Sequence, residues 1–233
     1  MSDVRIEAGL CDLNGRFDFY GAIHKALRRA QGELLIRLGR EDFTASSAKA
    51  TLADLRRLLA LAGQHIGHEE RFVHAHLDSP ALLDHQHDHH RQSLLRLEAL
   101  IRGIEAAPVE QKPAMGRRLY LVFGHFIAHD LLHMYEEETV AQPQLWAAMS
   151  DPALAGLEGA IVGSISPEDN MAYMRLMLAA LNPTERAGLL AGVRANAPAA
   201  VFNVIMGSVA QDVLSAEEMR DLQQRLGMVE AVL

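Results

Sequence analysis

The chain has 233 residues, of which 49% are hydrophobic and 22% are charged, and its formal net charge is −8. These proportions exclude extensive disorder, and the length fits one large domain or a medium domain with a smaller companion. The longest apolar run covers residues 176–181 and is far shorter than the ~18 residues that a membrane helix needs. The negative net charge, together with only three lysines among the 22 basic residues, argues against nucleic acid as a partner.

Two features near the start of the sequence bear on the compartment. Residues 1–10 carry Asp3, Arg5 and Glu7 and have no apolar segment of the kind found in secretory signals. The single cysteine, Cys11, cannot form an internal disulfide and suits a reducing environment. We therefore expect a cytoplasmic protein that has no membrane partner.

Good helix formers dominate the chain, and aromatic residues make up only 5% of it. The pattern predicts four long helices with short links, from Phe17 to about Leu38, from Ser46 or Ser47 to about His76, from Pro80 to about Ile104, and from about Glu110 to about Pro143. Short links favour antiparallel neighbours. Residues 1–150 are therefore predicted to form an all-α domain, an up-down-up-down antiparallel four-helix bundle.

After Met149 the pattern changes to short helices. Cap and turn signatures recur at Asp151-Pro152, Ser166-Pro167, Asn182-Pro183, Ala197-Pro198 and Ser215-Ala216. Residues 151–233 are predicted to be a C-terminal extension of unknown role. Because short helices are marginal alone, its apolar side chains must be buried against each other, against the bundle or against a second chain in a homo-oligomer. These side chains include Met171, Met174, Met177, Leu178, Phe202 and Ile205.

Histidine is distributed unevenly along the chain. All twelve histidines lie between His24 and His133, and eight of them lie between His65 and His90. Histidine is the commonest side-chain ligand of metal ions in proteins, so this clustering indicates a metal site.

Two segments repeat the pattern H-x-x-x-E-E. One contains His65 and Glu69, and the other contains His133 followed by Glu137 and Glu138. Residues four apart lie on one face of a helix, so each His–Glu pair can bind one cation. Both pairs lie near the ends of helices that run parallel in the predicted topology. We expect them at the same height in the bundle, with Glu138 as an alternative to Glu137.

The other two helices offer histidines at the matching level. His24 lies early in the first helix, and His85 and His89 share a face of the third helix, on which His87 points away. Whether His87 or His90 replaces His85 stays open. Five histidines and two glutamates suit two metal ions, and the mixture of imidazole and carboxylate suits iron, with zinc or manganese also compatible.

The order H…HxxxE…HxxxH…HxxxE resembles the hemerythrin family, a family of cation-binding four-helix bundles, over about residues 15–148. The resemblance implies a di-iron centre with an open position for oxygen, whose ligands are His24, His65, Glu69, His85, His89, His133 and Glu137. Oxygen-carrying hemerythrins have HxxxxD on the last helix. Here His125 and Asp130 have that spacing, but they lie roughly 12 Å from the expected level at 1.5 Å per residue. This departure argues against reversible oxygen carriage more than against metal binding.

The expected function is that of a non-enzymatic di-iron protein that binds or senses oxygen, nitric oxide or a related small ligand. The alternatives are a di-iron enzyme acting on oxygen or peroxide, an iron-handling or iron–sulfur repair protein, and a scaffold whose C-terminal extension recruits a partner. Oxygen-activating di-iron bundles use mostly glutamates, which favours binding over catalysis. The remaining histidines are expected at the surface (His68, His74, His76, His87 and His90) or in supporting roles (His125 and His129).

Overall fold

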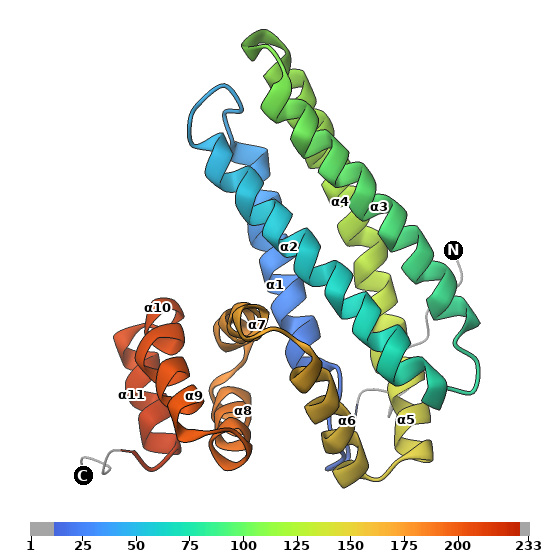
Figure 1. Ribbon diagram of the computed structural model, residues 1–233, viewed down its shortest axis with the longest axis vertical. Coiled ribbons are helices and arrows are strands. Elements are labelled where there is room, and N and C mark those ends of the chain that lie inside the picture. Colours follow the sequence, from blue (N-terminus) through green and yellow to red (C-terminus); the bar gives the residue numbers. More distant parts are fainter. Residues whose placement is uncertain (1–11, 229–233) are drawn as a thin grey trace. The chain divides into compact units, whose positions relative to one another are not determined.

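The computed structural model describes residues 12–228, and within that range the chain forms helices and turns without strands (Figure 1). The all-α prediction is confirmed for this part of the chain. No helix among the described residues combines the length and apolar character needed to span a membrane. Cys11, predicted to be an unpaired thiol, lies outside the described residues.

The helices occur in this order: α1 (Gly21–Arg40), α2 (Ala48–His68), α3 (Ala81–Ala106), α4 (Lys112–Glu136), α5 (Gln142–Ala148), α6 (Asp151–Ser164), α7 (Pro167–Ala180), α8 (Pro183–Asn196), α9 (Ala199–Val204), α10 (Ala210–Val213) and α11 (Ala216–Arg225). Three π-helical segments interrupt them, η1 (Glu69–Val73), η4 (Glu137–Ala141) and η5 (Ile205–Val209), and two short 3₁₀ segments are η2 (His74–His76) and η3 (Val109–Gln111).

Contacts divide the described chain into two compact units. The first contains residues 12–20 and 30–161, and the second contains residues 21–29 and 162–228. One boundary therefore runs through α1, which is a continuous helix, and another lies within α6. Residues 151–161, which the sequence assigned to the extension, belong to the first unit by their contacts.

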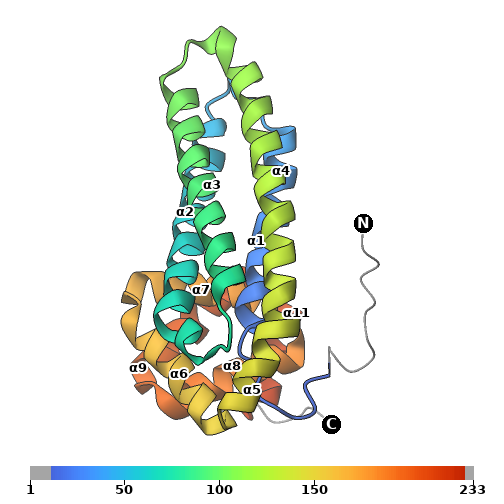
Figure 2. The same cartoon turned by 90° about the vertical axis from the view of Figure 1, so that its right-hand side faces the viewer.

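In the first unit, α2, α3 and α4 lie alongside one another in both views (Figure 1, Figure 2). The sequence forms α2 because buried leucines recur at spacings of three and four residues, from Leu52 to Leu59, and so share one face. Ion pairs join neighbouring helices at the rim. Arg56 of α2 reaches Glu105 of α3 at 3.0 Å, and Arg37 of α1 reaches Asp54 of α2 at 2.8 Å.

Gly116 of α4 allows the loop between α1 and α2 to pack closely. A Cβ atom at Gly116 would lie 2.0 Å from Cδ2 of the Phe43 ring, a distance that no side chain could occupy. Phe43 is buried, so its ring fills the space that the missing side chain leaves. The close approach therefore requires glycine at this position.

A second set of contacts ties residues 12–20 to α5 and the start of α6. The Arg16 guanidinium bonds to Asp151 at 2.7 Å and donates to the carbonyl oxygen of Met149 at 3.0 Å. The side-chain oxygen of Gln142 accepts from the backbone N–H of Phe19 at 3.0 Å. These bonds enclose an apolar cluster made by Tyr20, Val73, Leu83, Ala141, Leu145 and Leu154.

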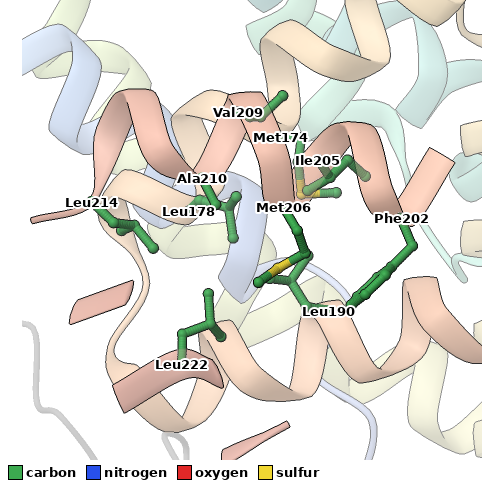
Figure 3. Close-up of a cluster of buried hydrophobic side chains, with 10 residues drawn as sticks. All are labelled: Met174, Leu178, Leu190, Phe202, Ile205, Met206, Val209, Ala210, Leu214 and Leu222. Carbon is green, nitrogen blue, oxygen red and sulfur yellow. The ribbon is translucent and has the colours of Figure 1, made fainter. Parts of the chain in front are cut away.

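Residues 162–228 have a hydrophobic core of their own (Figure 3). It is built by Met174, Leu178, Leu190, Phe202, Ile205, Met206, Val209, Ala210, Leu214 and Leu222. Met171 and Met177 pack against it from partly buried positions. The sequence left open whether these side chains pack against each other, against the bundle or against a second chain. Within this unit they pack against each other.

The short helices of this unit begin at the predicted caps. Asn182 and Ser215 each form a capping box with the glutamate three residues later, and Ser166 accepts from the backbone N–H of Asp169. Such caps satisfy N–H groups that the first turn of a helix leaves without partners. The prediction of short, capped helices is confirmed for α7, α8 and α11.

Candidate metal centre

The two HxxxE motifs share an unusual backbone feature. In each repeat the α-helix ends just before the glutamate, which is the first residue of a five-residue π-helix, Glu69 in η1 and Glu137 in η4. The sequence predicted regular helix through both sites. A π turn changes the direction of the side chains that follow, and such segments occur frequently at functional sites. The sequence repeat is therefore also a repeat of local structure.

Both His–Glu pairs lie within contact distance, as expected from their spacing. His65 Nε2 lies 3.0 Å from Glu69 Oε1, and His133 Nε2 lies 3.3 Å from Glu137 Oε2. The Glu69 and Glu137 side chains are 3% and 0% exposed, so both carboxylates are removed from solvent. Burying ionised carboxylates is costly unless positive charge or hydrogen bonds compensate them.

His87 is the histidine of α3 that joins these pairs. Its Nε2 lies 3.1 Å from Nε2 of His133 and 3.5 Å from Oε2 of Glu69. His85 and His89 were expected to face the inside of the bundle, but both side chains are exposed. The physical reason is the register of α3, whose buried face consists of Leu83, His87, His90, Leu97, Ile101 and Ile104. Two of the histidines expected at the surface, His87 and His90, are thus buried.

Two overlapping groups of ligand atoms could each hold a metal ion. The first contains His24, His65, Glu69 and Glu137, and the second contains Glu69, His87, His133 and Glu137. Within each group, among the described residues searched, the ligand atoms lie within 4.8 Å of one another. Both groups contain both glutamates. Five of the seven predicted ligands therefore appear in these groups, while His85 and His89 do not.

Neighbouring polar groups fix which ring nitrogen of His133 and of His87 faces the centre. Gln86 Nε2 donates to Glu136 at 2.6 Å, so Gln86 Oε1 accepts from His133 Nδ1 at 2.8 Å. His87 Nδ1 lies 3.2 Å from Oε1 of Glu70, which accepts its hydrogen. Both rings therefore direct Nε2 inward, and hydrogen bonds of this kind orient metal-binding histidines.

The close approach of His87 Nε2 to His133 Nε2 shows whether these residues fit a cation. Two neutral imidazoles that donate through Nδ1 would bring two lone pairs to 3.1 Å, which is repulsive. A proton or a metal ion between the two atoms removes this repulsion. Histidine nitrogens bind metals at about 2.0–2.1 Å, which this separation accommodates. The donor set therefore fits a metal ion.

The electrostatics of the centre are dominated by its carboxylates. Burial opposes the charged form of His87, but its hydrogen bond to Glu69 and the charges of Glu69, Glu137 and Glu70 together raise its pKa. Burial, followed by the charges of Glu137 and Glu69, raises the pKa of Tyr20 well above its usual value. The centre therefore favours cations.

Two more buried histidines surround the centre, although the sequence placed them at the surface. His90 presents its ring to the His133 ring at 4.9 Å, and its Nδ1 lies 3.6 Å from Asp130, which also bonds to Gln31. Burial, with smaller contributions from His87 and His89, lowers the pKa of His90 against the opposing effect of Asp130.

On the other side, His74 stacks on His87 at 4.9 Å and contacts Asp84 at 2.7 Å. Local sequence carries no signal for the burial of His74, because it depends on how the helices pack. Both rings are buried.

Comparison of the chain with family models, with curated proteins and with solved structures gave no match. The chemistry of the site must therefore be inferred from its own residues. Buried imidazole and carboxylate ligands can hold iron, zinc or manganese.

Proposed function

We propose that the protein is a hemerythrin-like di-iron protein whose helices α1–α4 form an up-down-up-down antiparallel bundle around the centre. Glu69 and Glu137 belong to both ligand groups, and this sharing supports two adjacent cations that would use both carboxylates. His24 and His65 would complete one position, and His87 and His133 the other. His87 takes the place that the resemblance implied for His85 and His89.

The histidine content of the centre favours binding or sensing of a small ligand over oxygen-activating catalysis, since di-iron enzymes of that kind use mainly glutamates. When bound, a di-iron centre supplies the capacity to react with oxygen or nitric oxide. The chain supplies the buried donors, and the buried rings of His74 and His90 pack against those of His87 and His133. The proposed ligand is therefore a small diatomic molecule.

Metal analysis of the purified protein tests the assignment. We expect about two metal ions per chain, predominantly iron, and a strong loss of metal in Glu137→Ala and His87→Ala. His85→Ala is the matched control, because His85 lies two residues from His87 on the exposed face of α3. Full metal content in both Glu137→Ala and His87→Ala would refute the ligand assignment.

Optical spectroscopy separates the possible functions. Reduced, iron-loaded protein kept without oxygen is expected to change its near-ultraviolet and visible spectrum when oxygen or nitric oxide is added. Reversal after the gas is removed supports binding or sensing, whereas repeated turnover of peroxide supports the enzymatic alternative. If the protein holds iron but its spectrum responds to neither gas, the result favours the alternative of a scaffold whose C-terminal extension recruits a partner.

A further inference from the structure

Three histidines of the first unit gather on its solvent-facing surface, outside both buried groups. They are His89 of α3 and His125 and His129 of α4, and all three are exposed. The ring centroids lie 4.5 Å apart for His125 and His129, 4.8 Å apart for His89 and His129, and 6.4 Å apart for His89 and His125. We call this set the surface triad.

The closest pair of the surface triad already has a separation suited to a metal. His125 Nε2 and His129 Nε2 are 3.2 Å apart. Two nitrogens bound tetrahedrally at about 2.0–2.1 Å to one ion lie roughly 3.3–3.4 Å from each other. The two residues are four apart on α4, so the helix holds their side chains on one face.

The third ring comes from a different helix. The His89 ring of α3 lies 4.8 Å from the His129 ring and is tilted by 49° to it, and α3 and α4 pack against each other, so the triad bridges two helices. Slight burial, followed by the charges of His125 and His89, lowers the pKa of His129. Neutral imidazole is the form that binds metal.

The donor set of the triad differs from that of the buried centre. It consists of three imidazoles, whereas the buried centre combines imidazoles with two carboxylates. All-imidazole sites suit zinc, copper and nickel, and three protein ligands leave a position that water fills. We propose that His89, His125 and His129 form a second metal site, at the surface, for a divalent ion of the zinc class.

Titration of the full-length, iron-loaded protein with Zn²⁺, followed by calorimetry, tests this site. The unsubstituted protein is expected to bind one Zn²⁺ per chain. His129→Ala is expected to weaken that binding at least about tenfold, the lower bound for losing even a hydrogen-bonding partner of a metal ligand. Because the three side chains are exposed, the fold is retained, and circular dichroism together with iron content verifies this.

His85→Ala is the matched control, since it removes an exposed histidine of α3 one turn from His89 and leaves the triad intact. Zinc binding is expected to be unchanged in it. Equal weakening in His85→Ala and His129→Ala would show unspecific binding to surface histidines and overturn the proposal. Unchanged zinc affinity in His129→Ala would overturn it as well. The result does not depend on the identity of the buried metal, because iron content is measured separately.

Discussion

The two units of the molecule bury different kinds of side chains. In the first unit the interior contains Glu69, Glu137 and a set of histidines together with its leucines. In residues 162–228 the core is apolar, and the buried charged side chain there, Arg186, donates to the carbonyl oxygens of Leu178 and Leu181 at 2.9 and 3.0 Å. Arg186 also pairs with Glu218 at 3.3 Å, so this part of the chain compensates its buried charge with its own groups. The buried carboxylates of the first unit instead belong to groups that could hold a metal ion.

This contrast teaches where stability comes from in each part. Apolar burial and helix caps need nothing outside the chain. Two buried carboxylates facing several imidazoles are costly to bury unless positive charge or hydrogen bonds compensate them, and a metal ion would supply such charge. Conditions that remove the cation should therefore affect the two units unequally.

The largest expected effect comes from metal removal. A ligand that binds only the folded state stabilises it by about 4 kcal/mol when its free concentration is about 1,000 times Kd. Chelation should therefore increase hydrogen exchange in peptides from residues 48–136 and leave peptides from residues 183–225 unchanged. Metal analysis confirms that the ion is gone. Equal protection in both regions before and after verified removal would contradict the comparison.

A cavity in the core of the second unit is expected to destabilise that unit and to leave metal binding unchanged. Leu190 is fully buried in the apolar core, and Leu190→Ala should destabilise that unit by about 2–5 kcal/mol. Metal content should stay at the level of the unsubstituted protein. Val204→Ala, at a position that is 53% exposed, is the control and should change stability by less than about 0.5 kcal/mol. Loss of metal in Leu190→Ala would show that the units depend on each other.

A smaller effect is expected from the residue that orients His133. Gln86 accepts from His133 Nδ1 and donates to Glu136, so Gln86→Ala removes the bond that directs Nε2 toward the centre. Metal affinity should fall roughly 10–100-fold, the usual cost of losing such a partner. Competition with a chelator of known affinity measures it. Affinity equal to that of His85→Ala would mean that packing alone orients the ring.

The parts of this architecture that depend on local sequence could be predicted. Caps such as Ser166, Asn182 and Ser215 act on N–H groups within three residues of themselves, so their chemistry is visible in the sequence. The His65–Glu69 and His133–Glu137 pairs were placed correctly within contact range for the same reason, since one helical turn fixes their separation.

The register of α3 could not be found from histidine spacing alone. Four histidines between positions 85 and 90 offer several possible faces, and the pair at 85 and 89 has the spacing that binds metals. The apolar residues further along the helix settle the question. Steps of seven residues back from Ile104 reach Leu97, His90 and Leu83, which therefore share one face of the helix. Two steps of seven back from Ile101 reach His87 on the same buried side. The packing face of a helix is thus a stronger guide than the spacing of its ligands.

The π-helical segments at Glu69 and Glu137 were not predictable. Neither EERFV nor EETVA contains proline or glycine, the residues that usually mark a break in a helix. The extra residue in each turn is stabilised by tertiary packing, as Val73 and Ala141 both lie in the apolar cluster beside Tyr20.

The smallest expected effect concerns a cap of the second unit. The Asn182 side chain accepts from the backbone N–H groups of Thr184 and Glu185, each at 3.0 Å. Asn182→Ala leaves both groups to solvent and should cost about 1 kcal/mol of unfolding free energy. Asn182→Asp keeps an acceptor at the N-terminus of α8, where negative charge is favourable, and should retain stability. Denaturant unfolding of the two variants measures the difference, and metal content should be unaffected in both. If Asn182→Asp is destabilised as much as Asn182→Ala, the cap contributes through packing instead of through its hydrogen bonds.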